Sequence, residues 1–435
     1  MMGVQGVRAQ DSLDFNTINN ESYRLVIAEE WDSTIKLGNR ALEQDVDYFY
    51  LRLRIGIAYY SKKNYRKAAT HFRKALGFNP GDPLTLEYLY FSRLFAGQRE
   101  RARLVQKDFM GELARRLGRK PQPLEQAGIG FVYSARLTGD PLEEQYQQPP
   151  DQPTGMQFQT RYFTNTTLSL SHGITPGFSL SHAYNHLSKY NYLYYYDGWG
   201  LLREESQHTR QNQYYISPAI TTRFGLTFSP MFHLVRMHYQ SPVYTGQGNN
   251  TQPVLQYLDS TDIATGLGLG ANLGPVDVNL GFYYANLNDR QQLQHRVGVT
   301  WYPLGNLNLY AGFYLNTQYE MSTSSDTTRF IPELHAGVAI AEKVWIDLNA
   351  SAGSMTHYLE NNGSIIYNSF GEVIRRKVSC TITVPVSKKG SLAYLGGRWC
   401  AHTSNFYSFT SQQAGTIYDI DYQTISIYGG LSWRF

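Results

Sequence analysis

The feature that most constrains this chain is an alternation of apolar and polar residues that recurs from residue 127 to the last residue, Phe435. In the final stretch, positions 425, 427, 429, 431, 433 and 435 are apolar or glycine, and positions 424, 426, 428, 430, 432 and 434 form the other, more polar set. The apolar positions are Ile425, Ile427, Leu431, Trp433 and Phe435. Side chains of a strand alternate between its two faces. The pattern therefore predicts antiparallel strands with one apolar face and one polar face.

The same alternation occurs along most of residues 127–435. Clear examples lie at 129–137, 276–284, 307–315 and 346–353. These segments run about 9–14 residues, longer than the ~5–6 residues of strands in soluble sheets, and they suit a tilted membrane crossing. No apolar run approaches the ~20 residues of a spanning helix. A mean hydropathy of −0.41 is compatible with a membrane barrel, because its strands are half polar.

The connections between these segments alternate in length. Short turns are expected at 175–177, 223–225, 274–275, 303–306, 341–343 and 387–390. Mostly longer loops are expected at 139–154, 190–211, 241–257, 288–291, 321–327, 358–370 and 405–419. Short turns at one end and long loops at the other are typical of outer-membrane barrels. The spacing predicts about fourteen strands, with both ends of the barrel on the short-turn, periplasmic side.

The N-terminal part has a helical period instead. Between residues 49 and 80, seven residues fall at the spacing of a tetratricopeptide repeat (TPR): Ile55, Gly56, Tyr59, Ala68, Phe72, Ala75 and Pro80. Gly56 and Ala68 are small where two helices press together, and Tyr59 and Phe72 fill the space between the helices. The flanking stretches fit two degenerate repeats. A plain bundle of helical hairpins is the alternative.

These periods divide the chain into four segments. Residues 1–14 are expected to be a signal-peptide remnant or disordered, 15–117 a TPR-like helical domain, 118–124 a linker, and 125–435 the barrel. Residues 1–120 carry 21 Lys and Arg against 14 Asp and Glu. This excess of positive charge indicates either attraction to an acidic partner or simply the solvated surface of ordinary helices.

The whole arrangement resembles bacterial outer-membrane β-barrel proteins that carry an N-terminal periplasmic TPR domain. Leu431, Trp433 and Phe435 match the closing strand of such barrels, where a terminal Phe after alternating apolar residues is the usual insertion signal. The resemblance implies an α plus transmembrane β fold: TPR-like hairpins, then an antiparallel barrel in the outer membrane.

The most aromatic segment lies at 190–207. Its members are Tyr192, Tyr194, Tyr195, Tyr196 and Trp199. Aromatic rings anchor protein interfaces and stack on sugars, so these residues are candidates for an extracellular contact loop. The alternatives are a packed lid or an extension of the aromatic girdle.

Charged and histidine residues at the polar positions of the strands are candidates for the barrel lumen. They are Arg136, Asp277, Arg296, Glu333, His335, Asp347, Lys377, Arg398 and Arg434. Their mixed signs predict internal pairing rather than a selective ion path. Barrels of 8 strands are filled by side chains and barrels of 16–18 hold a water channel. A barrel of about fourteen strands lies between these cases.

Other motifs favour a protein without catalytic or metal chemistry. Gly266, Gly268 and Gly270 alternate with leucines on a strand, so we interpret them as lumen-facing positions where backbones come close. His182 and His186 would lie about 13 Å apart on a strand, too far for one metal ion. No G-x-S-x-G nucleophile turn occurs. The sequence therefore predicts a non-enzyme with no cofactor and no nucleic-acid partner.

Two functions remain open. In the first, the protein is a subunit of an envelope assembly or secretion machine that sits in outer-membrane lipid, and its helices dock a periplasmic protein. In the second, the barrel is a pore that exports polysaccharide or another solute.

Overall fold

The structure is a computed structural model that describes residues 14–118, 123–137, 155–196, 202–245, 252–321, 326–341, 343–368, 371–387, 390–405, 407–408 and 419–435. It divides into two compact units. One comprises Met1–Lys120 and Tyr302–Leu307, and the other Pro121–Trp301 and Asn308–Phe435. The predicted signal-peptide remnant lies almost wholly outside the described residues.

The described N-terminal residues form seven helices. They are α1 (Phe15–Ile27), α2 (Trp31–Glu43), α3 (Phe49–Ser61), α4 (Tyr65–Phe78), α5 (Pro83–Phe95), α6 (Arg99–Gln106) and α7 (Gly111–Leu117). None of the described helices is long and apolar enough to cross a membrane. The start of α5 shows how local chemistry sets a boundary. The Asp82 carboxylate accepts a hydrogen bond from the Thr85 N–H at 2.8 Å and so caps the helix, and Pro83 is its first residue.

Helices α3 and α4 pack through the residues that the sequence singles out. Ile55, Ala68, Phe72 and Ala75 are fully buried. A Cβ atom on Gly56 would lie 2.5 Å from the Phe72 ring, so only glycine fits there. Tyr59 is half-buried and Pro80 is exposed in the turn after α4. The hairpin packing is as expected, whereas the assignment to TPR repeats stays a prediction.

His71 on α4 gives the helical unit a pH-dependent stability. Burial, together with the nearby Arg52 and Lys74, lowers the pKa of His71 to about 4. Its ring stacks on Tyr59 at 5.5 Å. The unfolded chain binds a proton at the ordinary pKa of about 6.5 while the folded helices do not, so stability is complete above pH 6.5 and is lost as the pH falls toward 4. Each pKa unit is worth about 1.4 kcal/mol.

We therefore expect a fragment of residues 15–117 to fold alone and to lose roughly 2–3 kcal/mol of unfolding free energy between pH 6.5 and 4. Urea titrations followed by circular dichroism measure this loss. In a His71→Gln variant the loss should shrink by that amount. A random-coil spectrum of the fragment at pH 7, or equal pH profiles for the two proteins, would contradict this account.

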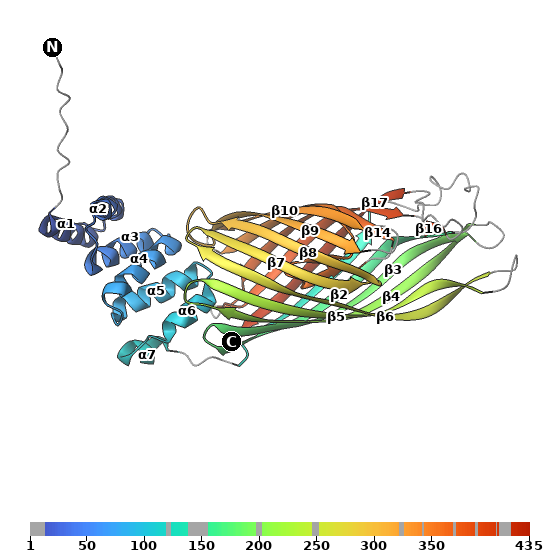
Figure 1. The fold of residues 1–435 in the computed structure, drawn as a ribbon, viewed down its shortest axis with the longest axis horizontal. Helices are drawn as coiled ribbons and strands as arrows, with labels where there is room; N and C mark the ends of the chain where they lie inside the picture. Colours follow the sequence, from blue (N-terminus) through green and yellow to red (C-terminus); the bar gives the residue numbers. More distant parts are fainter. Residues whose placement is uncertain are drawn as a thin grey trace, which may run out of the picture. The chain divides into compact units, whose positions relative to one another are not determined.

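The second unit is a closed antiparallel β-barrel (Figure 1). Its fourteen wall strands are β1 (Gln126–Arg136), β2 (Gly155–Thr175), β3 (Phe178–Tyr196), β4 (Leu202–Thr221), β5 (Leu226–Thr245), β6 (Gln252–Leu273), β7 (Val276–Leu287), β8 (Arg290–Trp301), β9 (Leu309–Met321), β10 (Thr327–Ile340), β11 (Val344–Met355), β14 (Glu372–Pro385), β15 (Leu392–Asn405) and β17 (Asp419–Arg434). Strand β1 pairs with both β2 and β17, which closes the wall. A two-residue strand, β16 (Tyr407–Ser408), pairs with β2. The predicted strand count is confirmed.

All six short turns lie where the alternation places them, between the ends of β2/β3, β4/β5, β6/β7, β8/β9, β10/β11 and β14/β15. We call this the short-turn end and the opposite end the long-loop end. The connection expected at 288–291 is shorter than the other long loops. Asn288 and Asp289 form a two-residue turn between β7 and β8, with positive φ angles of 51° and 59°. Two such residues match the right-handed twist of a hairpin.

The two faces of the wall differ as expected. On β8, Gln292 and Gln294 point into the lumen and are fully buried. Farther along the same strand, Val297, Val299 and Trp301 point outward and are about half exposed. The closing strand β17 repeats this pattern, with Leu431, Trp433 and Phe435 all outward and exposed. Their role as an insertion signal stays a prediction.

Strands β2 to β6 are longer than the sequence suggests, at 19–22 residues. A tilted crossing needs only ~9–11 residues. Toward the long-loop end, the outer face of this part of the wall turns polar. His238 on β5 pairs with Asp259 on β6 at 2.8 Å, and Tyr257 stacks on His238 at 4.8 Å. The outward residues of the wall are therefore apolar near the short-turn end, in what we call the apolar belt. Strands β2 to β6 continue beyond this belt.

The aromatic segment at 190–207 lies mostly in these long strands and not in a loop. Tyr192, Tyr194 and Tyr195 belong to β3. The side chains of Tyr194 and Tyr195 are only 0% and 6% exposed, which leaves them unavailable as extracellular contacts. Tyr196 ends β3, and Trp199 lies outside the described residues. Residues up to Tyr196 are therefore strand and not loop; the two-residue period is lost there because both faces of the strand are polar or aromatic. A contact role for Tyr192 and Tyr196 stays a prediction.

Glycines in the wall make room for tyrosines on the neighbouring strand. A Cβ on Gly266 would lie 2.3 Å from the Tyr283 ring, and one on Gly298 would lie 1.8 Å from the Tyr314 ring. Close approach is thus observed at Gly266, whereas Cβ atoms on Gly268 and Gly270 would meet only ordinary contacts at 3.5 Å. Lumenal tyrosine rings thus lie against the wall and leave part of the lumen free.

The register of β14 and β15 keeps the two cysteines apart. Cys380 is opposite Gly397, and Cys400 is opposite Lys377. Cys380 is exposed on the outer face, whereas Cys400 is buried on the lumenal face. We expect mass spectrometry under non-reducing conditions to find no 380–400 linked peptide. We also expect a maleimide to label Cys400 only after unfolding. A linked peptide would overturn both the register and the facing of this hairpin.

Candidate functional site in the barrel lumen

A small hairpin from the long-loop end folds into the barrel. It consists of β12 (Tyr358–Glu360) and β13 (Ile365–Tyr367), which pair with each other and with none of the wall strands. The turn between them contains Asn361, Asn362 and Gly363, all with positive φ angles of 50–75°. Asparagine and glycine tolerate this conformation better than other residues, so the sequence permits a tight reversal here. We call residues 356–368 the lumen hairpin.

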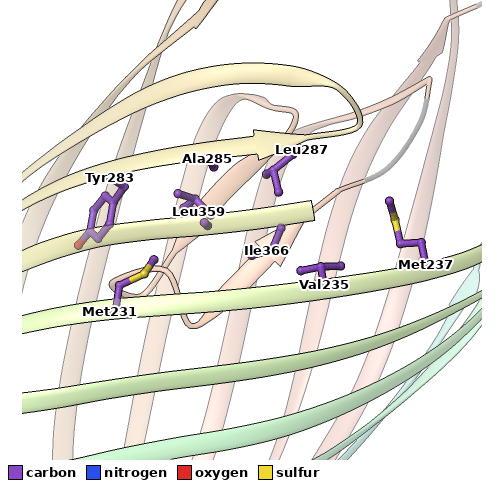
Figure 2. Packing of buried hydrophobic residues seen from close by; sticks show 9 residues of the cluster. Met231, Val235, Met237, Tyr283, Ala285, Leu287, Leu359 and Ile366 are labelled. Carbon is purple, nitrogen blue, oxygen red and sulfur yellow. The ribbon is translucent and has the colours of Figure 1, made fainter. Parts of the chain in front are cut away.

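Apolar side chains attach one face of the lumen hairpin to the wall. Leu359 and Ile366 join a buried cluster with Met231, Val235 and Met237 of β5 and with Ala264 of β6 and Tyr283, Ala285 and Leu287 of β7. Figure 2 shows the side chains of Leu359 and Ile366 between those of β5 and β7. Lumenal positions of a membrane barrel are usually polar. These apolar wall residues therefore form the surface against which the hairpin packs.

Glutamine side chains of the wall form hydrogen bonds with the backbone of the hairpin, in the place where a neighbouring strand would otherwise pair with it. The Gln294 side chain donates to the Leu359 carbonyl at 2.6 Å and accepts from the Leu359 N–H at 3.1 Å. Gln318 donates to the Thr356 carbonyl at 2.9 Å, and Gln292 donates to the His357 carbonyl. These bonds satisfy backbone groups that would otherwise be buried without partners.

The tip of the hairpin reaches the opposite side of the lumen. The Tyr283 hydroxyl donates to the Asn362 side chain at 3.0 Å, and His233 Nδ1 lies 2.8 Å from the Gly363 carbonyl. The hairpin leaves the wall between β11 and β14, and these partners lie on β7 and β5. It therefore spans the lumen and narrows it.

The sequence analysis missed this element. It placed 358–370 in an ordinary long loop at the extracellular side. A local signal does exist, because Asn-Asn-Gly stands between two short β-prone segments and is typical of a hairpin turn. The inward direction depends on Gln294, Tyr283 and His233, which lie 65 or more residues away in the sequence.

Charged lumenal residues surround the hairpin and pair as their mixed signs predict. Arg296 and Glu333 form an ion pair at 2.9 Å, and both are about nine-tenths buried. Lys377 pairs with Glu360 of the hairpin, which also accepts from the Tyr367 hydroxyl at 2.6 Å. Tyr358 donates its hydroxyl hydrogen to Glu333. Two carboxylates, Glu333 of the wall and Glu360 of the hairpin, thus hold the hairpin against the wall.

These groups line a cavity of about 380 Å³ between the hairpin and strands β8 to β17. Its polar lining includes Arg296, Glu333, His335, Glu360, Lys377 and Arg398. All except Glu360, which belongs to the hairpin, were predicted from the sequence to face the lumen. The structure brings them together at one level of the barrel.

The other lumen candidates lie apart from this cavity. Arg136 donates to Gln159, and Asp347 accepts from Tyr310. Asp277 accepts from Asn272 at 2.8 Å near the short-turn end. Arg434 lies at the end of β17. A second buried group was missed: Glu372, 3% exposed, pairs with Lys189.

The two histidines that were weighed as metal ligands lie on β3. His182 Nε2 is 3.1 Å from His172 Nε2, whereas His186 lies 2.8 Å from the Asn212 side chain. Among the described residues, no group of three His, Cys, Asp or Glu could hold a metal ion.

Comparison with known proteins finds only distant resemblances among solved structures. No protein-family model matches the sequence, and no curated protein matches it. Among solved structures, the toluene transporter TodX of P. putida is 9% identical, covers 75% of this chain and 95% of its own, and has a TM-score of 0.44. A FadL homologue of Pseudomonas aeruginosa is 6% identical over 72% of this chain and 90% of its own, also with a TM-score of 0.44.

A mutant of the protein MamA matches 23% of this chain and 72% of its own, at 21% identity and with a TM-score of 0.21. At these TM-scores the resemblances carry no argument about this chain. The assignment of a closed barrel rests on the strand pairing itself.

Proposed function

We propose that the protein is an outer-membrane channel for small solutes, narrowed from inside by the lumen hairpin. The observation that carries this proposal is the hairpin itself, which lies across a lumen that still holds a polar cavity of about 380 Å³. A barrel that serves only as an anchor needs no such internal element.

The outer wall supports the membrane location. A closed barrel leaves no unpaired strand edge, which is the condition for β-structure in lipid. The outward residues of the shorter strands are apolar, as Val299 on β8, Phe313 on β9 and Ile427 on β17 illustrate. The chain enters the barrel at the short-turn end, and we place that end, with the N-terminal helices, in the periplasm.

The pore is the better supported of the two functions that the sequence leaves open. No feature of the described residues supports the role of a scaffold in an assembly or secretion machine. Docking of a periplasmic protein by the helices remains a prediction, as does the absence of enzymatic activity.

Two measurements test this proposal. The protein should fractionate with outer membranes and migrate differently on gels before and after heating, because closed barrels resist unfolding. In planar bilayers the purified full chain should produce small, discrete conductance steps. Recovery as a soluble protein would overturn the location, and a folded barrel with no conductance in any recording would overturn the channel.

A further inference from the structure

The polar cavity beside the lumen hairpin has an excess of positive charge. Its lining contains three permanent cations, Arg296, Lys377 and Arg398, and two carboxylates, Glu333 and Glu360. Arg296 pairs with Glu333, and Lys377 pairs with Glu360. Arg398 has no ion-pair partner within the described part of the barrel. One positive charge in this cavity is therefore left without a counter-charge from the protein.

Two guanidinium groups also have unused hydrogen-bond donors here. Arg398 Nε is buried and has no hydrogen-bond partner among the described residues. Arg296 is 8% exposed, and its Nη1 is likewise buried without a partner, although its Nη2 binds Glu333. Buried donors normally have a partner, because a buried polar group without a hydrogen bond keeps the full cost of its lost hydration. Both residues line the same cavity.

We propose that this cavity binds the carboxylate group of a small anionic solute, and that Arg398 selects for it. This inference rests on the proposed channel function and specifies its substrate class. A guanidinium presents a planar fork of donors that matches a carboxylate. One unpaired cation balances one carboxylate, whereas a phosphate carries closer to two charges. A volume of about 380 Å³ suits a ligand of monosaccharide size.

The test is equilibrium binding to the full-length protein in detergent, with D-galacturonate as the probe and D-galactose and D-galactosamine as its neutral and cationic counterparts. Saturation-transfer NMR or calorimetry measures the affinities. We expect galacturonate to bind at least tenfold more tightly than either counterpart. Arg398→Gln should weaken galacturonate binding tenfold or more, since hydrogen bonds between two charged groups are roughly twice as strong as neutral ones.

Arg376→Gln is the matched control. It removes the same charge from the neighbouring strand β14. Arg376 is exposed there and lies two positions before Val378, so both side chains are on the outer face of the wall. Its affinity should equal that of the wild type. Glu360→Gln should strengthen galacturonate binding, because it removes a negative charge from the cavity. This variant also tests the proposal if Arg398→Gln does not fold, which heat-modifiable migration would reveal.

Equal binding of galacturonate and galactose would overturn the inference. So would undiminished galacturonate binding by folded Arg398→Gln, or weakened binding by Glu360→Gln. Conductance distinguishes this failure from that of the channel proposal. A protein that conducts but does not prefer galacturonate refutes only the binding site, whereas one that binds galacturonate without conducting refutes only the channel.

Discussion

Replacing residues 358–367 with a short Gly-Ser linker should raise the single-channel conductance several-fold over that of the wild type. The lumen hairpin leaves the wall next to β14 and reaches β5, so its removal widens the lumen where the hairpin crosses it. A fourteen-strand barrel is close in size to the 16–18-strand barrels that hold an open water channel. Single-channel recording in planar bilayers measures the change.

The matched control alters another connection at the same end of the barrel. The turn at Asn288 and Asp289 joins β7 to β8 and forms no part of the hairpin. Asp289→Gly, which suits the positive φ angle of that residue, should leave the conductance unchanged. Asn288 is kept in this control because its side chain lies 3.4 Å from His357 of the lumen hairpin. An unchanged conductance in the hairpin replacement would show that residues 358–367 do not limit the path.

Glu333→Leu should cost about 3–5 kcal/mol of unfolding free energy, the usual cost of removing one partner from a buried ion pair. It leaves the buried Arg296 guanidinium without a counter-charge and the Tyr358 hydroxyl without its acceptor. Urea titration of the barrel in lipid vesicles measures the loss.

Adding Arg296→Met to Glu333→Leu should restore most of the stability, because both charges of this buried ion pair are then absent. This double variant separates charge burial from lost packing. If the single variant loses less than about 1 kcal/mol of unfolding free energy, or if the double variant recovers none, the ion pair does not stabilise the barrel.

The wall of the barrel could be predicted from the sequence because its physics is local. An apolar outer face and a polar inner face impose a two-residue period, and short turns fix the register. The hairpin of β14 and β15 illustrates this. Its turn at 387–390 sets Val386 against Ser391, and Cys380 then falls opposite Gly397, as observed.

The remainder could not be predicted because it depends on contacts distant in sequence. The inward fold of residues 358–367 is decided by Gln294, Tyr283 and His233 on three separate strands. The ends of β2 to β6 were missed for another reason. Beyond the apolar belt the outer face is polar, as His238 and Asp259 show, so the two-residue period disappears although the strands continue.

The most direct test of the central claim is cysteine modification during single-channel recording. Ser379 and Val378 are neighbours on β14, but Ser379 lines the lumenal cavity whereas Val378 is 49% exposed on the outer face. In a background with Cys380→Ser and Cys400→Ser, each is replaced by cysteine and treated with a charged methanethiosulfonate reagent. We predict stepwise reduction of the conductance for Ser379→Cys and none for Val378→Cys. Equal responses of the two variants would contradict a conducting path through the barrel lumen.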